Sequence, residues 1–233
     1  QGIWRWLSDA VSKGILKDTI TFGSQENSRN RALKGSIDGS LATIDLSEAS
    51  DRVHADLVGY LFNGNPLLDG IHACRTRYVM QTIDDSQRKG CCFRKFAPMG
   101  SALTFPIESI VFAAIAIWAV HISEGRISKE SIDKRTVRMS ARQVTVFGDD
   151  IIVPTTAVGP LLVILEALGL KVNTTKSFWN GKFRESCGVD ALMGVDVTPA
   201  YLLGMYDGSA TSMSSVIECS NNFHKHGLWR SAQ

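Results

Sequence analysis

Short apolar runs of β-rich composition occur at three places along the chain. Residues 41–46 form one run, and residues 143–147 and 151–153 form two more, separated by Gly148-Asp149-Asp150. A strand, a tight Gly/Asp turn and a second strand predict a β-hairpin. The first run predicts a further strand, and a helix start should follow at residues 47–51, where Ser and Asp side chains suit free backbone N–H groups.

Two longer apolar stretches predict buried helices. Residues 104–121 would form a helix of about 27 Å at 1.5 Å per residue. Pro106 is compatible with this helix only in its first turn, so we expect the helix to begin near residues 101–104. Its uncharged apolar run covers about fourteen residues, fewer than the about 20 that a membrane span requires, which predicts a core helix. Residues 158–168 predict a second helix, ended by Gly169.

The remaining segments have weaker patterns, and residues 1–38 are mixed and polar. The order strand, helix, helix, hairpin, helix, strands predicts an α+β fold with an antiparallel sheet, because a doubly wound fold would alternate strands and helices. The weaker expectations are a turn-rich hinge at residues 35–40, a loop at 63–70, a strand or loop at 171–178, and short strands at 182–188 and 194–199.

Composition excludes several classes of protein. The chain has 233 residues, of which 44% are hydrophobic and 21% charged, which disfavours disorder, collagen-like repeats and coiled coils. The net charge is only +2, so any polyanion would have to be bound by local basic clusters. Five cysteines without a Cys-x-x-Cys pair predict free thiols in a reducing compartment. The start at Gln1, without a signal-like segment, predicts a processed piece or a fragment.

The Gly148-Asp149-Asp150 turn is the most informative feature of the sequence. Two adjacent carboxylates between apolar strands repel each other in a partly dry setting, which is costly unless a cation neutralises them. Carboxylate oxygens suit Mg²⁺ or Mn²⁺ rather than zinc. Since successive side chains on an extended chain face opposite ways, Asp149 is the better candidate for direct coordination, and Asp150 would support it. The alternative is an ordinary hairpin turn, in which Gly and Asp are common.

Asp45, at the end of the 41–44 run, extends this hypothesis. If that strand pairs beside the hairpin, Asp45 and Asp149 would face each other from neighbouring strands. Two carboxylates so placed would form a two-metal site, which stabilises the attacking and leaving oxygens of an in-line phosphoryl transfer. The alternative for Asp45 is a helix N-cap region.

Several motifs in chain order resemble the palm of an RNA-dependent RNA polymerase, and more narrowly the replicase catalytic subunit of leviviruses, the small RNA phages of bacteria. Two of them are residues 146–154, with Gly-Asp-Asp, and residues 44–51, and the motifs in order are far more specific than any one alone. The resemblance covers about residues 1–205 and implies the central part of a longer protein. The other motifs are residues 35–45, 99–105, 168–178, 183–188 and 194–199.

The resemblance implies a role for each of these motifs. Asp45 and Asp149 would bind two Mg²⁺ ions, for which Mn²⁺ can substitute, with Asp150 in support. Lys176 would protonate the leaving pyrophosphate, and Lys171 is the alternative candidate for this role.

Further contacts with nucleotide and RNA are implied in the same way. Asp51, Ser101, Thr104 and Glu108 would lie at the incoming nucleotide and its ribose, and the alternative for Glu108 is a buried acid paired with an arginine. The template or primer contacts would be Gly100 and Arg184, where Arg184 has the alternative of pairing with an acid.

The resemblance also implies an organisation and a setting. Residues 1–40 would be part of the fingers, residues 41–199 the palm with an inserted fingers portion around 60–97, and residues 200–233 the start of a thumb or a C-terminal extension. The partners would be a single-stranded RNA template, the nascent RNA, ribonucleoside triphosphates and host translation factors, with no membrane. The location would be the cytoplasm of an infected bacterium.

Two other classes of function remain open from the residues alone. Phe147-Gly-Asp-Asp150 also fits the spacing of a reverse-transcriptase-like polymerase. A non-catalytic RNA-binding or assembly module would use the basic stretches 75–95 and 126–142, each with six cations and two anions. Asp45 and Asp149 argue against the second class, because a binder of polyanions does not need clustered carboxylates.

Overall fold

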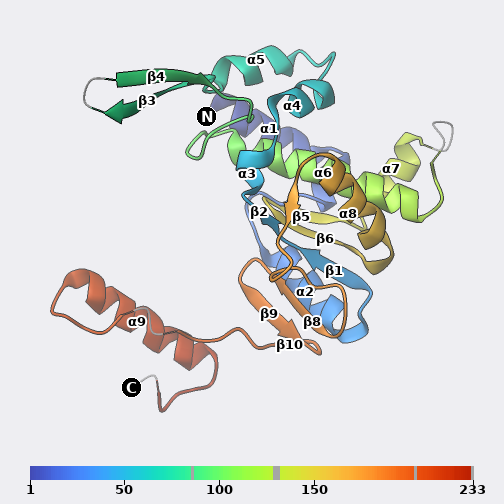
Figure 1. Ribbon diagram of the computed structural model, residues 1–233. Helices are drawn as coiled ribbons and strands as arrows, with labels where there is room; N and C mark the ends of the chain where they lie inside the picture. The colour runs from blue at the N-terminus through green and yellow to red at the C-terminus, as the bar shows by residue number, and fades with distance from the viewer. Residues whose placement is uncertain (85–86, 128–131, 202–203, 232–233) are drawn as a thin grey trace. The chain divides into compact units, whose positions relative to one another are not determined.

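The computed structural model describes residues 1–84, 87–127, 132–201 and 204–231, without the side chains of residues 83–88. By contacts the chain divides into two units, Gln1–Asp196 and Val197–Gln233. The first unit is a mixture of helices and antiparallel sheets, which confirms the predicted α+β class (Figure 1).

A three-stranded antiparallel sheet forms the centre of the first unit. Its strand order is β1 (Leu41–Ile44), β6 (Asp150–Pro154), β5 (Thr145–Phe147), and all four residues of β1 are buried. Ile44 pairs with Ile151, and Phe147 pairs with Asp150. The predicted strand and hairpin are therefore confirmed, and the strand that precedes Asp45 lies directly beside the hairpin.

Helices cover both faces of this sheet. α6 (Thr104–Ser123) and α8 (Val158–Ala167) pack on the face that includes Ile44 and Ile151, and together they form the main hydrophobic core. By length and composition α6 would also suit a membrane span, but 72% of its apolar window is buried inside the protein. Contact with the hydrophobic core on several sides explains why the helix is apolar all round. Both predicted helices are confirmed, with Gly169 in the left-handed region after α8.

The opposite face of the sheet packs against α2 (Glu26–Asp38). A Cβ added at Gly35 would lie 2.9 Å from the Cβ of Leu41, so only glycine lets this helix approach β1 so closely. The expected hinge at residues 35–40 is therefore wrong, since α2 continues to Asp38 and ends at Gly39. The helix buries small residues, which leave no apolar periodicity in the sequence: Ser28, Ala32, Gly35 and Ser36.

Two smaller sheets extend the first unit. One has the order β10 (Val195–Asp196), β9 (Val189–Leu192), β8 (Phe183–Ser186), and the other pairs β2 (Leu46–Ser47) with β7 (Lys171–Val172). Two backbone hydrogen bonds between Thr43 and Phe178 join β1 to the segment before β8. These contacts bring residues 173–187 next to the end of β1.

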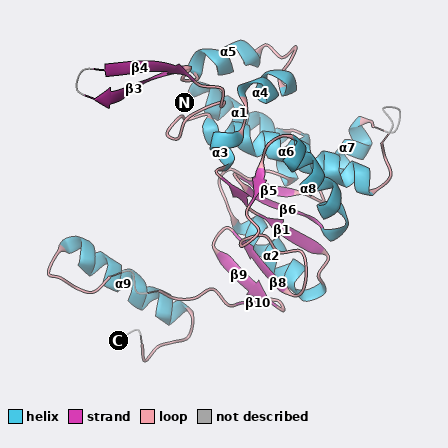
Figure 2. Cartoon of the chain, in the orientation of Figure 1, coloured by secondary structure: helices cyan, strands magenta, loops and turns pink. Residues whose placement is uncertain are grey.

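The remaining elements of the first unit are helices and a two-stranded sheet (Figure 2). The expected loop at residues 63–70 is wrong in its second half, because Asn65 Oδ1 accepts a hydrogen bond from Leu67 N and α5 begins there. In the second unit the described helix is α9 (Ala210–Lys225). The others, in chain order, are α1 (Gly2–Lys13), η1 (Ile15–Asp18), α3 (Ala49–Arg52), α4 (Ala55–Leu61), α5 (Leu67–Cys74), β3 (Tyr78–Asp84), β4 (Gln87–Cys92), α7 (Lys134–Ala141) and η3 (Thr155–Ala157).

Candidate active site

The tight turn of the central hairpin presents the two adjacent aspartates. Gly148 has a φ of 62°, and an added Cβ would lie 3.0 Å from the Phe105 ring, so the turn requires glycine. Its N–H donates to Ser109 Oγ at 3.1 Å, which ties the turn to α6. Asp149 lies in this turn, and Asp150 begins β6.

The Asp150 carboxylate is held by the turn between β8 and β9. It accepts hydrogen bonds from Cys187 N at 3.2 Å, Cys187 Sγ at 3.4 Å and Ser186 Oγ at 3.4 Å. Burial raises the pKa of Asp150, the charges of Asp149 and Asp45 raise it further, and the Cys187 bonds oppose the rise. Burial and the neighbouring carboxylate raise the pKa of the Cys187 thiol to about 11, so it remains a protonated donor.

Asp45 lies immediately after β1 and opposite the hairpin turn. Asn173 Nδ2 donates to Asp45 Oδ2 at 2.8 Å, and Ser177 Oγ accepts from the Asp45 backbone N–H at 3.0 Å. Burial and the charge of Asp149 raise the pKa of Asp45, against the effects of the Asn173 bond and the Lys176 charge. Asp45 and Asp149 are therefore close enough to repel each other, as expected of neighbouring acids.

Glu108 approaches the hairpin from α6. Burial and the charge of Asp149 raise its pKa to about 8, so the side chain is mostly a neutral carboxylic acid at pH 7. In the described part of the chain no arginine or lysine forms an ion pair with Glu108. The expected alternative of an arginine partner is therefore not what the structure has.

Lys176 stands beside the acidic cluster. Its Nζ lies 3.9 Å from Glu185 Oε1, and its charge lowers the pKa of both Asp45 and Glu185 against the effect of burial. The Lys176 side chain is 57% exposed, so it can move toward a ligand. Lys171 is paired with Ser47 through the β2–β7 backbone and forms no ion pair with a described residue. Of the two lysines, only Lys176 is placed among the carboxylates.

The other expected nucleotide contacts lie near the start of α6 or on α3. Gly100 is exposed with a φ of 90°, and Thr104 Oγ1 donates to Pro98 O at 3.1 Å in the first turn of α6. Ser101 is half-buried in the same loop. Asp51, on α3, pairs with Lys95 Nζ at 2.6 Å and so is engaged with a cation.

Arg184 does not fit the expected contact with RNA. Its side chain is 0% exposed, and the guanidinium donates to the backbone carbonyls of Leu41, Asn180, Gly181 and Phe183. Burial lowers the pKa of Arg184 and the charge of Asp38 opposes this, but among the described residues Arg184 forms no ion pair with an acid, and its donors point into the protein. Arg184 instead fixes the second sheet to β1, and the expectation of a primer contact is wrong.

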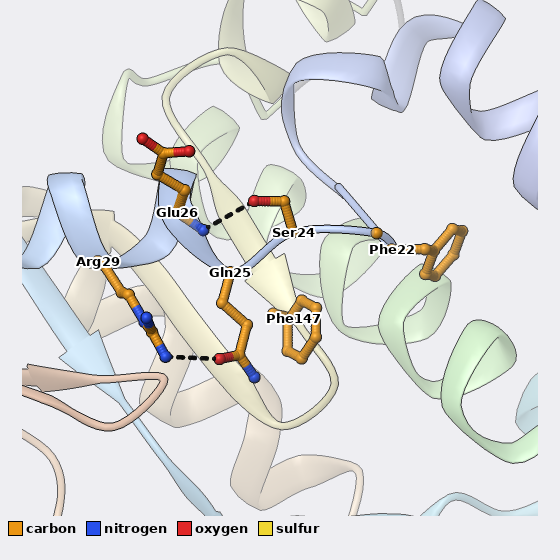
Figure 3. Close-up of a pocket in the computed structure, with 7 residues that line it drawn as sticks. Phe22, Ser24, Gln25, Glu26, Arg29 and Phe147 are labelled. Atoms are coloured by element: carbon orange, nitrogen blue, oxygen red, sulfur yellow. Dashed lines mark hydrogen bonds between the residues drawn. The ribbon is translucent and has the colours of Figure 1, made fainter. Parts of the chain in front are cut away.

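A cavity of about 560 Å³ opens beside the hairpin (Figure 3). Phe147 lines it from β5, opposite the segment that runs from Phe22 into α2. Arg29 Nη2 donates to Gln25 Oε1 at 3.0 Å in this cavity, and Arg29 Nε donates to Cys187 O at 3.1 Å. Arg29 thus anchors the same turn that holds Asp150, and the cavity adjoins the acidic site.

The acidic residues were tested for their fit to a divalent cation. In residues 1–84, 87–127, 132–201 and 204–231, no three His, Cys, Asp or Glu side chains are arranged as a ready metal site. Asp149 accepts no hydrogen bond and forms no ion pair with a described residue, while repulsion and burial raise the pKa of Asp45. Mg²⁺ prefers carboxylate oxygens, and Asp45, of which one oxygen is bonded to Asn173, and Asp149 repel each other, so the two side chains fit such an ion.

The residues of this sheet and its acidic turn lie within a match to a known protein family. A family model described as RNA replicase, beta-chain matches residues 9–227, and the chain belongs to this family. It is similar to the RNA-directed RNA polymerase subunit beta of Escherichia virus Qbeta, with 34% identity over 85% of this chain and 31% of that protein. The RNA-directed RNA polymerase beta chain of Escherichia phage MS2 is 36% identical over 78% of this chain and 30% of that protein. The chain spans about a third of the length of the curated relatives it matches.

Several residues of the site, among them the four named next, were not singled out by the sequence. Asn173 and Cys187 hydrogen-bond to aspartates, Ser109 binds the turn, and Glu185 pairs with Lys176. All but Ser109 lie inside stretches that carry the family resemblance, which was their only signal. Their roles follow from contacts between segments far apart in the chain, and no local pattern encodes such contacts.

Proposed function

We propose that this chain forms the catalytic part of an RNA-dependent RNA polymerase that adds ribonucleotides to the 3′ end of RNA. The observation that supports this most is the charge interaction between Asp45, which follows β1, and Asp149, in the turn before the strand paired with β1, in a chain of the replicase family. The relatives are named RNA-directed RNA polymerases, which favours RNA copying over a reverse-transcriptase-like reaction. The nearness of the Asp45 and Asp149 charges argues against a non-catalytic module, because a binder of polyanions does not need clustered carboxylates.

In this proposal residues 41–199 are the palm, with a fingers portion around 60–97. Residues 1–40 belong to the fingers, and residues 200–233 begin a thumb or C-terminal extension. The template, nascent RNA and ribonucleoside triphosphates are the ligands, host translation factors are partners, and the reaction occurs in the cytoplasm of an infected bacterium. The relatives come from phages of bacteria, which supports this setting.

Asp45 and Asp149 would hold two Mg²⁺ ions, or Mn²⁺ in their place. Bound there, the ions supply charge stabilisation for the attacking 3′ oxygen and the leaving pyrophosphate. Asp150 supports this pair from the side of the β8–β9 turn, because Cys187 and Ser186 fix its carboxylate. Repulsion among the three aspartates favours cation binding, since a cation lowers the pKa values that burial has raised.

The neighbouring residues have separate tasks in the same reaction. Lys176, exposed and close to Asp45, donates a proton to the leaving pyrophosphate. Glu108, neutral at pH 7, donates a hydrogen bond toward the ribose of the incoming nucleotide. Ser101 and Thr104 contact that nucleotide, and Gly100 permits a close approach of the template.

Primer extension with Mg²⁺ by the complete replicase polypeptide tests this proposal. Asp149→Asn keeps the shape of the side chain but removes its charge, and we expect synthesis to fall by about a hundredfold or more. The control is Asp56→Asn on α4, an exposed aspartate outside the acidic cluster, which should leave synthesis unchanged. Near-normal synthesis by Asp149→Asn would show that the assignment is wrong.

A further inference from the structure

A small cavity lies between two segments that are more than a hundred residues apart in the chain. Its volume is about 120 Å³, and four cations line it. Lys13 ends α1 and Lys17 belongs to η1, whereas Arg138 belongs to α7 and Arg142 follows that helix. Asp18 is the acid in the lining, so the side chains around the cavity have a net charge of +3.

Buried hydrogen bonds hold the two walls of the cavity together. Thr19, which is 0% exposed, donates from Oγ1 to the backbone oxygen of Ala141 at 2.7 Å. Val146 N donates to Thr19 O at 2.8 Å, which extends the contact along β5. The backbone around the four cations is therefore fixed before any ligand arrives, which lowers the entropy lost on binding.

The positive charges of this cavity are poorly neutralised by the protein. Lys17 and Arg138 form no ion pair and no side-chain hydrogen bond with any described residue. The Arg142 Nε to Asp18 Oδ2 distance is 3.8 Å, and both side chains are more than half exposed, so this pair contributes little. Lys13 pairs with Asp9 at 2.7 Å on the surface. Four cations around one cavity, with one acid in the lining, favour an anion in it.

We propose that this cavity binds a phosphate group of single-stranded RNA. Its volume suits one phosphate and is below the about 300 Å³ of a site for a whole nucleotide-sized ligand. Arg142 and Asp149 are seven residues apart and flank β5, which separates them by at most about 23 Å at 3.3 Å per residue. The cavity therefore lies at the end of β5 away from the acidic turn. The choice of RNA as the source of the phosphate rests on the proposed function.

The test is the salt dependence of RNA binding by the 233-residue chain. A fluorescein-labelled, unstructured 20-nucleotide RNA is titrated by fluorescence anisotropy between 50 and 200 mM NaCl, with EDTA present so that no metal contributes. In Lys17→Gln/Arg138→Gln/Arg142→Gln, three phosphate-binding cations are lost. We expect the slope of log K against log[salt] to become shallower by about 0.7, since the cavity neutralises one phosphate and each neutralised phosphate of a single strand contributes about 0.7.

Two further variants separate a local site from general electrostatics and from misfolding. Arg5→Gln/Lys34→Gln/Lys225→Gln removes the same charge at exposed positions outside the cavity lining, and it should leave the slope nearly unchanged. Lys17→Arg/Arg138→Lys/Arg142→Lys keeps the charge and should keep the slope. An equal loss in both Gln triples overturns the proposal, and so does an unchanged slope in the cavity triple.

A second arm distinguishes RNA from free phosphate. Calorimetric titration with inorganic phosphate measures the cavity without RNA. Phosphate binding that the cavity triple abolishes, together with an unchanged RNA slope, would assign the cavity to free phosphate and overturn the RNA assignment. The proposed function is tested apart from this, because Asp149→Asn should abolish synthesis without weakening the salt dependence of RNA binding.

Discussion

Glu108 should make the stability of this protein depend on pH at values above those at which a carboxylate usually titrates. Its pKa is raised from 4.5 to about 8 in the folded chain by burial and by Asp149. Between these values the folded state binds one more proton than the unfolded state, so the free energy of unfolding falls as pH rises. The stability is fully present below pH 4.5 and is lost as pH approaches 8.

The magnitude follows from the same shift. One proton corresponds to about 1.4 kcal/mol per pH unit, or about 4 kcal/mol between pH 5 and 8. The Glu108 side chain is partly exposed, and solvent screening reduces this to about 2 kcal/mol. Glu108→Gln keeps the shape but does not titrate, so the variant should match the parent at pH 5 and exceed its stability by about 2 kcal/mol at pH 8.

Urea unfolding at pH 5, 6, 7 and 8 measures the difference, with EDTA present to exclude bound metal. The free energies come from linear extrapolation, which is adequate for a difference of this size. Glu166→Gln on α8 is the control, since it removes an exposed carboxylate outside the acidic cluster. If the parent and Glu108→Gln show the same pH slope, then Glu108 is already ionised and the account of its environment is wrong.

Three other substitutions test other parts of the site. Lys176→Ala should slow turnover, measured by steady-state kinetics, by about tenfold or more, while RNA affinity, measured by anisotropy, changes little. An equal loss of turnover and affinity would indicate that Lys176 contacts a phosphate instead. Gly148→Ala should lower the free energy of urea unfolding by about 2 kcal/mol, because the residue has a positive φ and an added Cβ would contact Phe105. Gly181→Ala is the control, since Gly181 has a φ of 65° but open space around it, and it should lose only about 1 kcal/mol. Equal losses in the two variants would show that the contact with Phe105 is unimportant. Arg184→Met should lower the free energy of urea unfolding by about 3 kcal/mol, because four backbone carbonyls lose their buried donor. A change of about 0.5 kcal/mol or less, the size expected of a surface substitution, would contradict this role.

The elements that the sequence predicted well are those with a local cause. The hairpin around Gly148 follows from two apolar runs and a Gly/Asp turn, and α6 from a long apolar stretch with Pro106 in its first turn. α2 escaped prediction because it buries small and polar side chains, so no apolar stripe marks it. The start of α5 was missed although Asn65 and Pro66 together form a helix-start signal.

Some residues of the candidate site could likewise be predicted from local sequence patterns, and others could not. Asp45, Asp149 and Asp150 were recognisable because acids at the ends of apolar strands are unusual in sequence. Arg184 was misjudged, since an arginine beside a glutamate has the same pattern whether it faces solvent or the core. Its burial depends on β1, which lies more than a hundred residues earlier in the chain.

By itself the sequence determined the identity of the acids, the turn that presents them and the helix behind them, because these depend on neighbours along the chain. Tertiary structure alone decided which acids repel each other, that Glu108 holds its proton, and that Lys17 and Arg138 meet across a cavity. Desolvation and Coulomb interaction act through space, so the charge state of a side chain is set by what the fold packs around it.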